Sequence, residues 1–129
     1  MVAAIVLGAV ACGSSKTATP AATTVAPESL RTTDAEVAKG LRTLETTAAG
    51  IASAATDKAK AAALVEAIEP AWQPIEGTVK ANDSATYLAM EDAFALLEKG
   101  ATEGSAATAQ QGSDAVAKAV ASYLAAHPG

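Results

Sequence analysis

Three carboxylates in the middle of the chain have the side-chain type and the spacing that suit a hard cation. Glu69 and Glu76 are two helical turns apart, and Glu91 follows them after the polar turn at Asn82. If the segments before and after that turn are antiparallel helices, the three side chains can meet. Carboxylate oxygens suit Ca²⁺, Mn²⁺ and oxidised iron, so these three glutamates are candidate metal ligands. The alternative is a solvated acidic face on which Lys80 pairs with Glu76.

Aromatic side chains in the same segment form a second group of candidates. Trp72, Tyr87 and Asp92 would line a binding pocket beside the carboxylates if the two helices pack together, and Phe94 would lie close to them. Aromatic residues at helical spacing are also the ordinary content of a hydrophobic core. Both interpretations stay open, and in either case we expect Trp72 to anchor the core.

The chain lacks the residues from which a catalytic centre is usually built. His127 is its single histidine and lies two residues from the C-terminal end of the sequence. It would either ligate a metal or interact favourably with the C-terminal dipole of a helix. No glycine-rich phosphate loop occurs, and nothing indicates a raised carboxyl pKa. We therefore expect a protein that is not an enzyme and has no cofactor apart from a possible hard cation.

The charge of the chain is negative and concentrated in its middle. Fourteen acidic residues stand against nine Lys and Arg, giving a formal net charge of −5. Between residues 64 and 98 Lys80 is the one base, against a run of acids: Glu66, Glu69, Glu76, Asp83, Glu91, Asp92 and Glu98. Nucleic acids require a basic surface, so they are excluded as partners. A cation or a basic protein fits this field better.

Cys12 is the single cysteine, and it follows the apolar run from Met1 to Ala11. The junction Ala11-Cys12-Gly13 resembles the signal of bacterial lipoproteins, a resemblance confined to the first dozen or so residues. It implies that residues 1–11 are a signal peptide, that Cys12 is lipidated, and that the protein is extracytoplasmic and held at the cell membrane. Residues 12–28 are rich in Ser, Thr, Ala and Pro, which predicts a flexible linker. Residues 29–129 then form one small domain.

A weaker resemblance concerns about 35 residues of that domain. Trp72, Ile75-Glu76, Tyr87 and Glu91-Asp92 look like parts of the helical repeats in extracytoplasmic imelysin-type iron-uptake lipoproteins. The resemblance implies an accessory role in the uptake of a metal such as iron or copper. It keeps a metal-handling function open beside the binding of a protein partner.

Apolar residues recur every three or four positions along the domain, and no stretch alternates as a strand would. Thr33 and Glu36 form a capping-box pattern, Asn82-Asp83-Ser84 supplies caps for the third helix, and Gly100 is a natural helix stop. The stripe continues in phase through Pro70 and Pro74, so we expect one helix kinked there; the alternative is a helix that ends and a new one that begins near Pro70. The four expected helices span residues 33–54, 57–79, 85–99 and 105–126.

Short connections between helices of similar length indicate an all-α, up-down-up-down antiparallel four-helix bundle. The function that we expect is a membrane-anchored, non-enzymatic binding module for a cation or for a basic envelope protein. The alternatives are an accessory component of metal uptake and a structural spacer without a ligand.

Overall fold

The computed structural model describes residues 25–129; the expected signal peptide, Cys12 and the linker as far as residue 24 lie outside this range. The described chain is helical and contains no strand, which confirms the all-α class. Its elements are η1 (Pro27–Ser29), α1 (Asp34–Ala54), α2 (Lys58–Val65), α3 (Ile68–Asn82), α4 (Ser84–Glu103) and α5 (Ala106–Ala126).

Helix α1 begins as the capping pattern predicts. The Thr33 hydroxyl accepts a hydrogen bond from the Glu36 backbone N–H, and the Glu36 carboxylate accepts one from the Thr33 backbone N–H. Two backbone donors that the helix cannot satisfy internally are thus paired. The predicted apolar stripe is buried along the full length of the helix, from Val37 to Ile51.

The segment expected as one helix kinked at Pro70 and Pro74 is two helices in the structure. Helix α2 ends at Val65, the turn is at Glu66 and Ala67, and α3 begins at Ile68. Pro70 therefore lies in the first turn of α3, where a backbone N–H would have no helical partner in any case. Pro74 stays inside α3. The alternative of a new helix starting near Pro70 therefore describes the chain better, although the apolar stripe remains in phase across the break.

Helix α4 runs past the predicted stop at Gly100. It ends at Gly104, which has a φ of +73°, a left-handed conformation that glycine adopts without steric cost. Gly100 instead gives room to α5: a Cβ there would lie 2.7 Å from the Cα of Ala109. The start of α4 is capped by Asp83, whose carboxylate accepts hydrogen bonds from the backbone N–H groups of Ala85 and Thr86.

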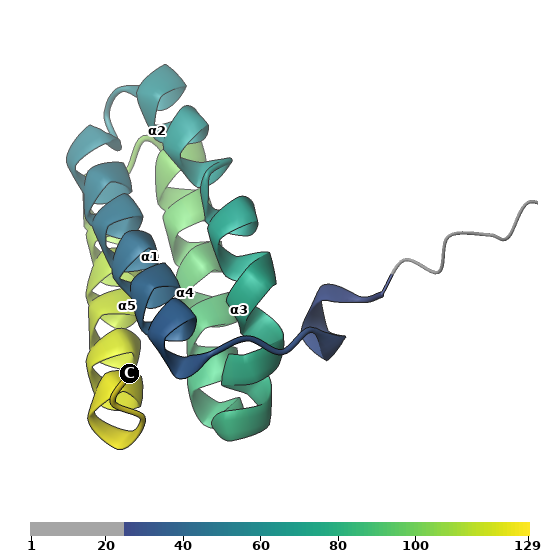
Figure 1. The fold of residues 1–129 in the computed structure, drawn as a ribbon. Helices are drawn as coiled ribbons and strands as arrows, with labels where there is room; N and C mark the ends of the chain where they lie inside the picture. The colour runs from purple at the N-terminus through teal and green to yellow at the C-terminus, as the bar shows by residue number, and fades with distance from the viewer. Residues whose placement is uncertain (1–24) are drawn as a thin grey trace, which may run out of the picture.

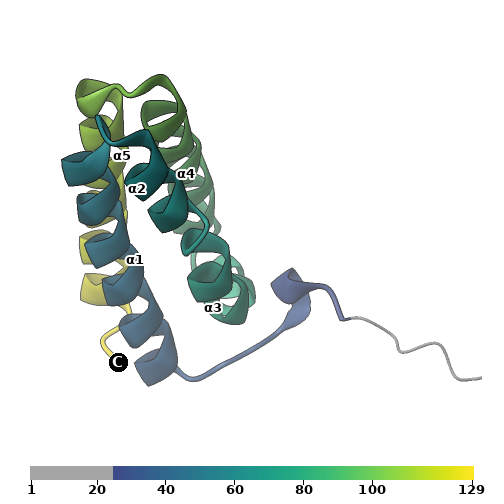
Figure 2. The same ribbon diagram turned by 90° about the horizontal axis from the view of Figure 1, so that it is seen from above.

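The helices pack as a bundle around one core. Helix α5 packs against α4 and α1, α3 packs against α1 and α4, and the short α2 lies between α1 and α4 at one end (Figure 1). A view from above shows α3 flanked by the N-terminal segment that contains η1 (Figure 2). The largest buried side chains are Trp72, Tyr123, Leu41, Leu44, Ile51, Met90 and Leu97.

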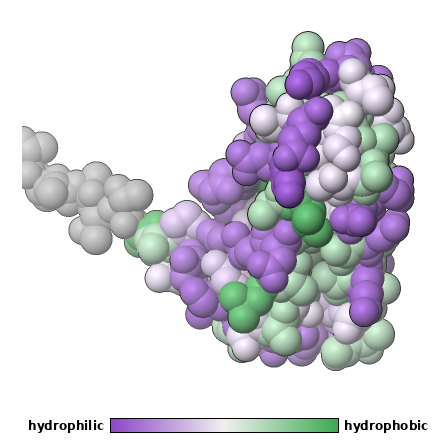
Figure 3. Space-filling model, turned by 180° about the vertical axis from the view of Figure 1, so that it is seen from behind, coloured by the Kyte–Doolittle hydropathy of each residue, from purple (hydrophilic) through white to green (hydrophobic). Residues whose placement is uncertain are grey.

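The outer surface is mixed in character. Seen from behind, hydrophilic side chains alternate with small hydrophobic ones, and strongly hydrophobic spots are isolated (Figure 3). The large hydrophobic residues that stay exposed are Val25, Leu30 and Leu88. Among residues 25–129, no helix combines the length and the apolar character needed to cross a membrane.

Candidate functional site

A pocket between α3 and α4 combines acidic and aromatic side chains, and we refer to it as the α3–α4 pocket. It has a volume of about 380 Å³. Its charged and aromatic lining consists of Glu69, Trp72, Glu91, Phe94 and Glu98, with Val65 at the end nearest α2. Three carboxylates therefore surround an aromatic wall, and no basic residue lines the pocket. Such a surface attracts cationic groups.

Trp72 holds the two helices of this pocket together. Its side chain is 2% exposed, and its indole N–H donates a hydrogen bond of 2.6 Å to Glu91 Oε1. The indole ring stacks on Tyr87 with centroids 5.9 Å apart and meets the edge of Phe94 at 5.4 Å. The burial of Trp72 confirms that it anchors the core. The hydrogen bond also fixes the Glu91 carboxylate at the pocket wall.

Glu76 lies on the same helix but does not line the pocket. Its residue surface is only 8% exposed. Burial raises the pKa of its carboxyl group, and the nearby negative charges of Glu69, Glu91 and Glu28 raise the pKa further, against the opposing effect of Lys80. The ionised form of Glu76 is thus disfavoured where it stands.

The segment from Pro27 to Thr32, which we call the strap, covers the flank of α3 beside Glu76. The Thr32 backbone N–H donates a hydrogen bond of 2.9 Å to Thr78 Oγ1, and Glu28 forms an ion pair with Lys80. A Cβ at Gly77 would lie 2.7 Å from the Glu28 carbonyl oxygen, so the strap approaches α3 closely because that residue is glycine. Lys80 thus pairs with the strap, and its ammonium group lies 4.8 Å from the Tyr87 ring centroid.

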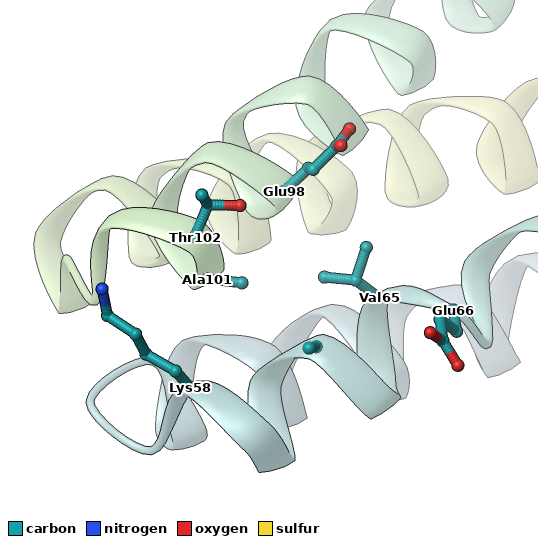
Figure 4. Close-up of a pocket in the computed structure, with 7 residues that line it drawn as sticks. Lys58, Val65, Glu66, Glu98, Ala101 and Thr102 are labelled. Atoms are coloured by element: carbon teal, nitrogen blue, oxygen red, sulfur yellow. The ribbon is translucent and has the colours of Figure 1, made fainter.

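A second pocket adjoins the first and shares Val65 and Glu98 with it; we call it the α2–α4 pocket. Its volume is about 320 Å³, and its lining includes Lys58, Glu66 and Thr102. The close-up shows Lys58 reaching from α2 toward α4 at one end, while Glu66 and Glu98 lie toward the other (Figure 4). The two pockets thus lie next to each other along α4, and we call them together the groove; its charged lining is acidic except at Lys58.

The structure brings some of the predicted site residues together and leaves others apart. Glu69, Glu91 and Trp72 line one pocket, while Tyr87 supports Trp72 from behind that lining. Asp92 is exposed on α4 and lines neither pocket of the groove. Within residues 25–129, no three acidic, histidine or cysteine side chains form a group that could hold a metal ion. The metal-ligand role of Glu69, Glu76 and Glu91 stays a prediction.

His127 caps the C-terminal end of α5. Its backbone N–H donates a hydrogen bond to the Tyr123 carbonyl oxygen, and its ring lies 4.6 Å from the Tyr123 ring centroid. It lines neither pocket of the groove.

Glu98, Glu66 and Lys58 line the two pockets but were not among the site residues expected from the sequence. Glu98 lies two helical turns after Glu91, so helical spacing alone places both on one face of α4. No comparable signal in the sequence indicates Lys58. Whether its side chain lines a pocket depends on how α2, which begins at Lys58, packs against α4.

Comparisons with protein-family models, with curated proteins and with solved structures find no match to this chain.

Proposed function

We propose that this chain is an extracytoplasmic lipoprotein, held at the membrane through lipidated Cys12, whose helical bundle is a non-enzymatic binding module for a basic partner protein. The observation that carries the proposal is the α3–α4 pocket, where Glu69, Glu91 and Glu98 surround Trp72 and Phe94. The resemblance of the Ala11-Cys12 junction to lipoprotein signals supports the location.

The chemistry of the pocket fits a lysine or arginine side chain better than a bare metal ion. Such a side chain has an apolar stem that can lie on the aromatic wall and a charged head that can reach the carboxylates. A metal ion would need several carboxylates converging on one point, whereas one oxygen of Glu91 already accepts the Trp72 hydrogen bond.

The proposal includes an up-down-up-down order of the bundle, with α2 and α3 together as its second leg and a change of direction between them near Pro70. The short connections at Asp83 and at Gly104-Ser105 support antiparallel neighbours. This order gives α3 and α4 opposite directions, so the residues on either side of the Asp83 turn, including Trp72 and Glu91, face one another across the pocket.

Trp72 is the single tryptophan of the chain, so its fluorescence reports directly on the pocket. The full chain carrying Cys12→Ser is titrated with a short peptide that has two arginines among small neutral residues. We expect a saturable change of emission with this peptide and none with the same peptide in which glutamine replaces arginine. The pair Glu69→Gln/Glu91→Gln should weaken binding by roughly tenfold, since two exposed ion pairs contribute up to about 1 kcal/mol each.

The matched control is Glu45→Gln/Asp114→Asn, which removes two charges from α1 and α5, outside the groove. An equal loss of peptide affinity in this control pair would show that the peptide responds only to the overall negative charge of the chain. That result would contradict the proposal. Displacement of the peptide by micromolar Mn²⁺ or Fe³⁺ would favour the metal-uptake alternative instead. If none of these probes binds, the proposal fails, and the alternative of a structural spacer without a ligand remains.

A further inference from the structure

A basic surface lies on α1, outside the acidic pocket. Lys39 and Arg42 line a shallow pocket of about 430 Å³ together with Thr43, Thr46 and Thr47, and no acidic residue lines it. We call it the α1 surface. The three threonine hydroxyls donate hydrogen bonds of 3.0–3.1 Å to backbone carbonyl oxygens one helical turn earlier. The charged groups that this surface offers to a partner are therefore its two cationic side chains.

No ion pair compensates the charges of Lys39 and Arg42. Both residues are exposed, and in the part of the chain that the structure describes the one ion pair joins the strap to α3. The Glu36 carboxylate accepts hydrogen bonds from Thr33 in the capping box, and Glu45 does not line the α1 surface. The α1 surface is thus locally positive in a chain whose net charge is −5.

The α1 surface and the α3–α4 pocket have opposite charges and separate positions. The pocket presents Glu69, Glu91 and Glu98 and no base, whereas the α1 surface presents two bases and no acid. The two linings share no residue. Figures 1 and 2 show α1 and α5 on one side of the bundle and α3 and α4 on the other. One molecule can therefore use both surfaces at the same time.

The spacing of the charges suits a contact between one helix and a pair of helices. Lys39 and Arg42 are three residues apart on α1, so they lie on one face of it. Glu91 and Glu98 are separated by a rise of roughly 10 Å along α4. The long apolar stems of lysine and arginine let the two charged heads spread toward different carboxylates. Side chains that project from one helix also pack readily into the depression between two others.

We infer that the basic partner of the α3–α4 pocket is a second copy of this chain, which docks through Lys39 and Arg42 of its α1. The contact joins two different surfaces, so a pair of molecules keeps one free pocket and one free α1 surface, and further copies can add in a row. The association is weak, because exposed ion pairs contribute little and molecules of the same net charge repel. This inference rests on the proposed function and names the partner.

Sedimentation velocity of the full chain with Cys12→Ser measures this association. At low salt we expect the mean sedimentation coefficient to rise with protein concentration, and added salt should suppress the rise. Lys39→Glu/Arg42→Glu should weaken the association by at least about tenfold, since it removes two ion pairs and brings like charges together. Glu69→Lys/Glu98→Lys should weaken it as strongly, although the net charge of this variant is closer to zero than the −5 of the parent.

The two charge-reversed variants should associate when they are mixed. In an equimolar mixture the unchanged pocket of the first variant meets the unchanged α1 surface of the second, which restores the parental contact. The matched control is Lys60→Glu/Lys118→Glu, which makes the same change of net charge as the first variant, at exposed positions that line neither surface. It should keep most of the association. Circular dichroism of each variant checks that the fold is kept.

Several results overturn the inference: a parent whose sedimentation does not depend on concentration, an equal loss in the control pair, or a mixture that does not associate. Association that persists in both charge-reversed variants would arise elsewhere, such as from the apolar residues 1–11, and would overturn it too. The arginine peptide decides the proposed function separately. If the peptide binds while the parent stays monomeric, the pocket takes a different basic partner; if the peptide does not bind either, both proposals fail.

Discussion

At the scale of single residues, Trp72 is the largest fully buried side chain in the described part of the chain. Trp72→Ala removes the ring that stacks on Tyr87 and meets Phe94, so we expect a loss of about 3–5 kcal/mol in the free energy of unfolding. Urea denaturation followed by circular dichroism measures this loss. The control is Leu88→Ala, at a side chain that is 61% exposed, where the change should stay below about 0.5 kcal/mol.

The second prediction at the scale of residues concerns Glu76 and the pH dependence of the free energy of unfolding. Its pKa is raised above the ordinary 4.5 chiefly by burial, so the folded protein binds this proton more tightly than the unfolded chain does. The contribution of Glu76 to the free energy of unfolding should therefore fall as pH rises from about 4.5 through the higher folded pKa. Glu76→Gln has no such proton, so it should be more stable than the parent at pH 7 and should lose that part of the pH dependence.

Urea midpoints measured between pH 4 and pH 8 test the role of Glu76. The control is Asp114→Asn, which removes a charge from the exposed face of α5. The quantity that tests Glu76 is the difference between the parent and Glu76→Gln, because Glu36 and Asp83 have lowered pKa values and change the stability in the opposite direction. A difference that does not fall as pH rises over this window, or the same gain at pH 7 in both variants, would be incompatible with a buried, charge-crowded Glu76.

At the scale of elements, the sequence patterns located both ends of α1 and α5 to within one residue and failed where a boundary depends on tertiary packing. The caps of α1 and α4 could be predicted from Thr33, Glu36 and Asp83 because a cap depends on residues next to each other in the chain. The stop at Gly100 was wrong, because whether a glycine ends a helix or makes room for a neighbour depends on tertiary packing against Ala109. The same limit applies to the break before α3, since the apolar stripe continues in phase through it.

The sequence indicated several residues of the candidate site, but it did not indicate which of them come together in one pocket. Helical periodicity pointed to Trp72, Glu69 and Glu91, which line one pocket. It also grouped Glu76 with them, although that side chain is buried and does not line the pocket. The strap, which contacts Thr78 and Lys80 on the same helix, comes from a segment whose composition gave no sign of contact with α3.

The contact between the strap and α3 gives an element-scale prediction. Gly77→Ala would place a methyl group 2.7 Å from the Glu28 carbonyl oxygen, so the strap must move away. We expect destabilisation of about 1–3 kcal/mol and faster amide exchange at Thr32, whose N–H bonds Thr78. Gly50→Ala is the control: its Cβ would meet only Leu64, at 3.4 Å, so the better helix former should be neutral or stabilising.

At the scale of the whole molecule, the prediction concerns Cys12. If the Ala11-Cys12 junction is processed as its resemblance to lipoprotein signals implies, the mature protein begins with a lipidated cysteine. Cys12→Ser should then move the protein from the membrane fraction to the soluble fraction, because a lipid anchor supplies its hold on the bilayer. Mass spectrometry of the native N-terminus provides the direct measurement, and an unmodified thiol or an intact leader would refute the prediction.

If the chain is held at the membrane through Cys12, as proposed, the position of the strap has a mechanical consequence. A pull on the chain reaches residues 27–32 before it reaches α1, and these residues lie along α3 (Figure 2). The load is first carried by the Glu28–Lys80 ion pair and the hydrogen bond between Thr32 and Thr78. Two weak bonds on the surface would yield under tension while the core stays closed. The strap would then detach from α3 and extend under a small force, before any force reaches the helices of the core.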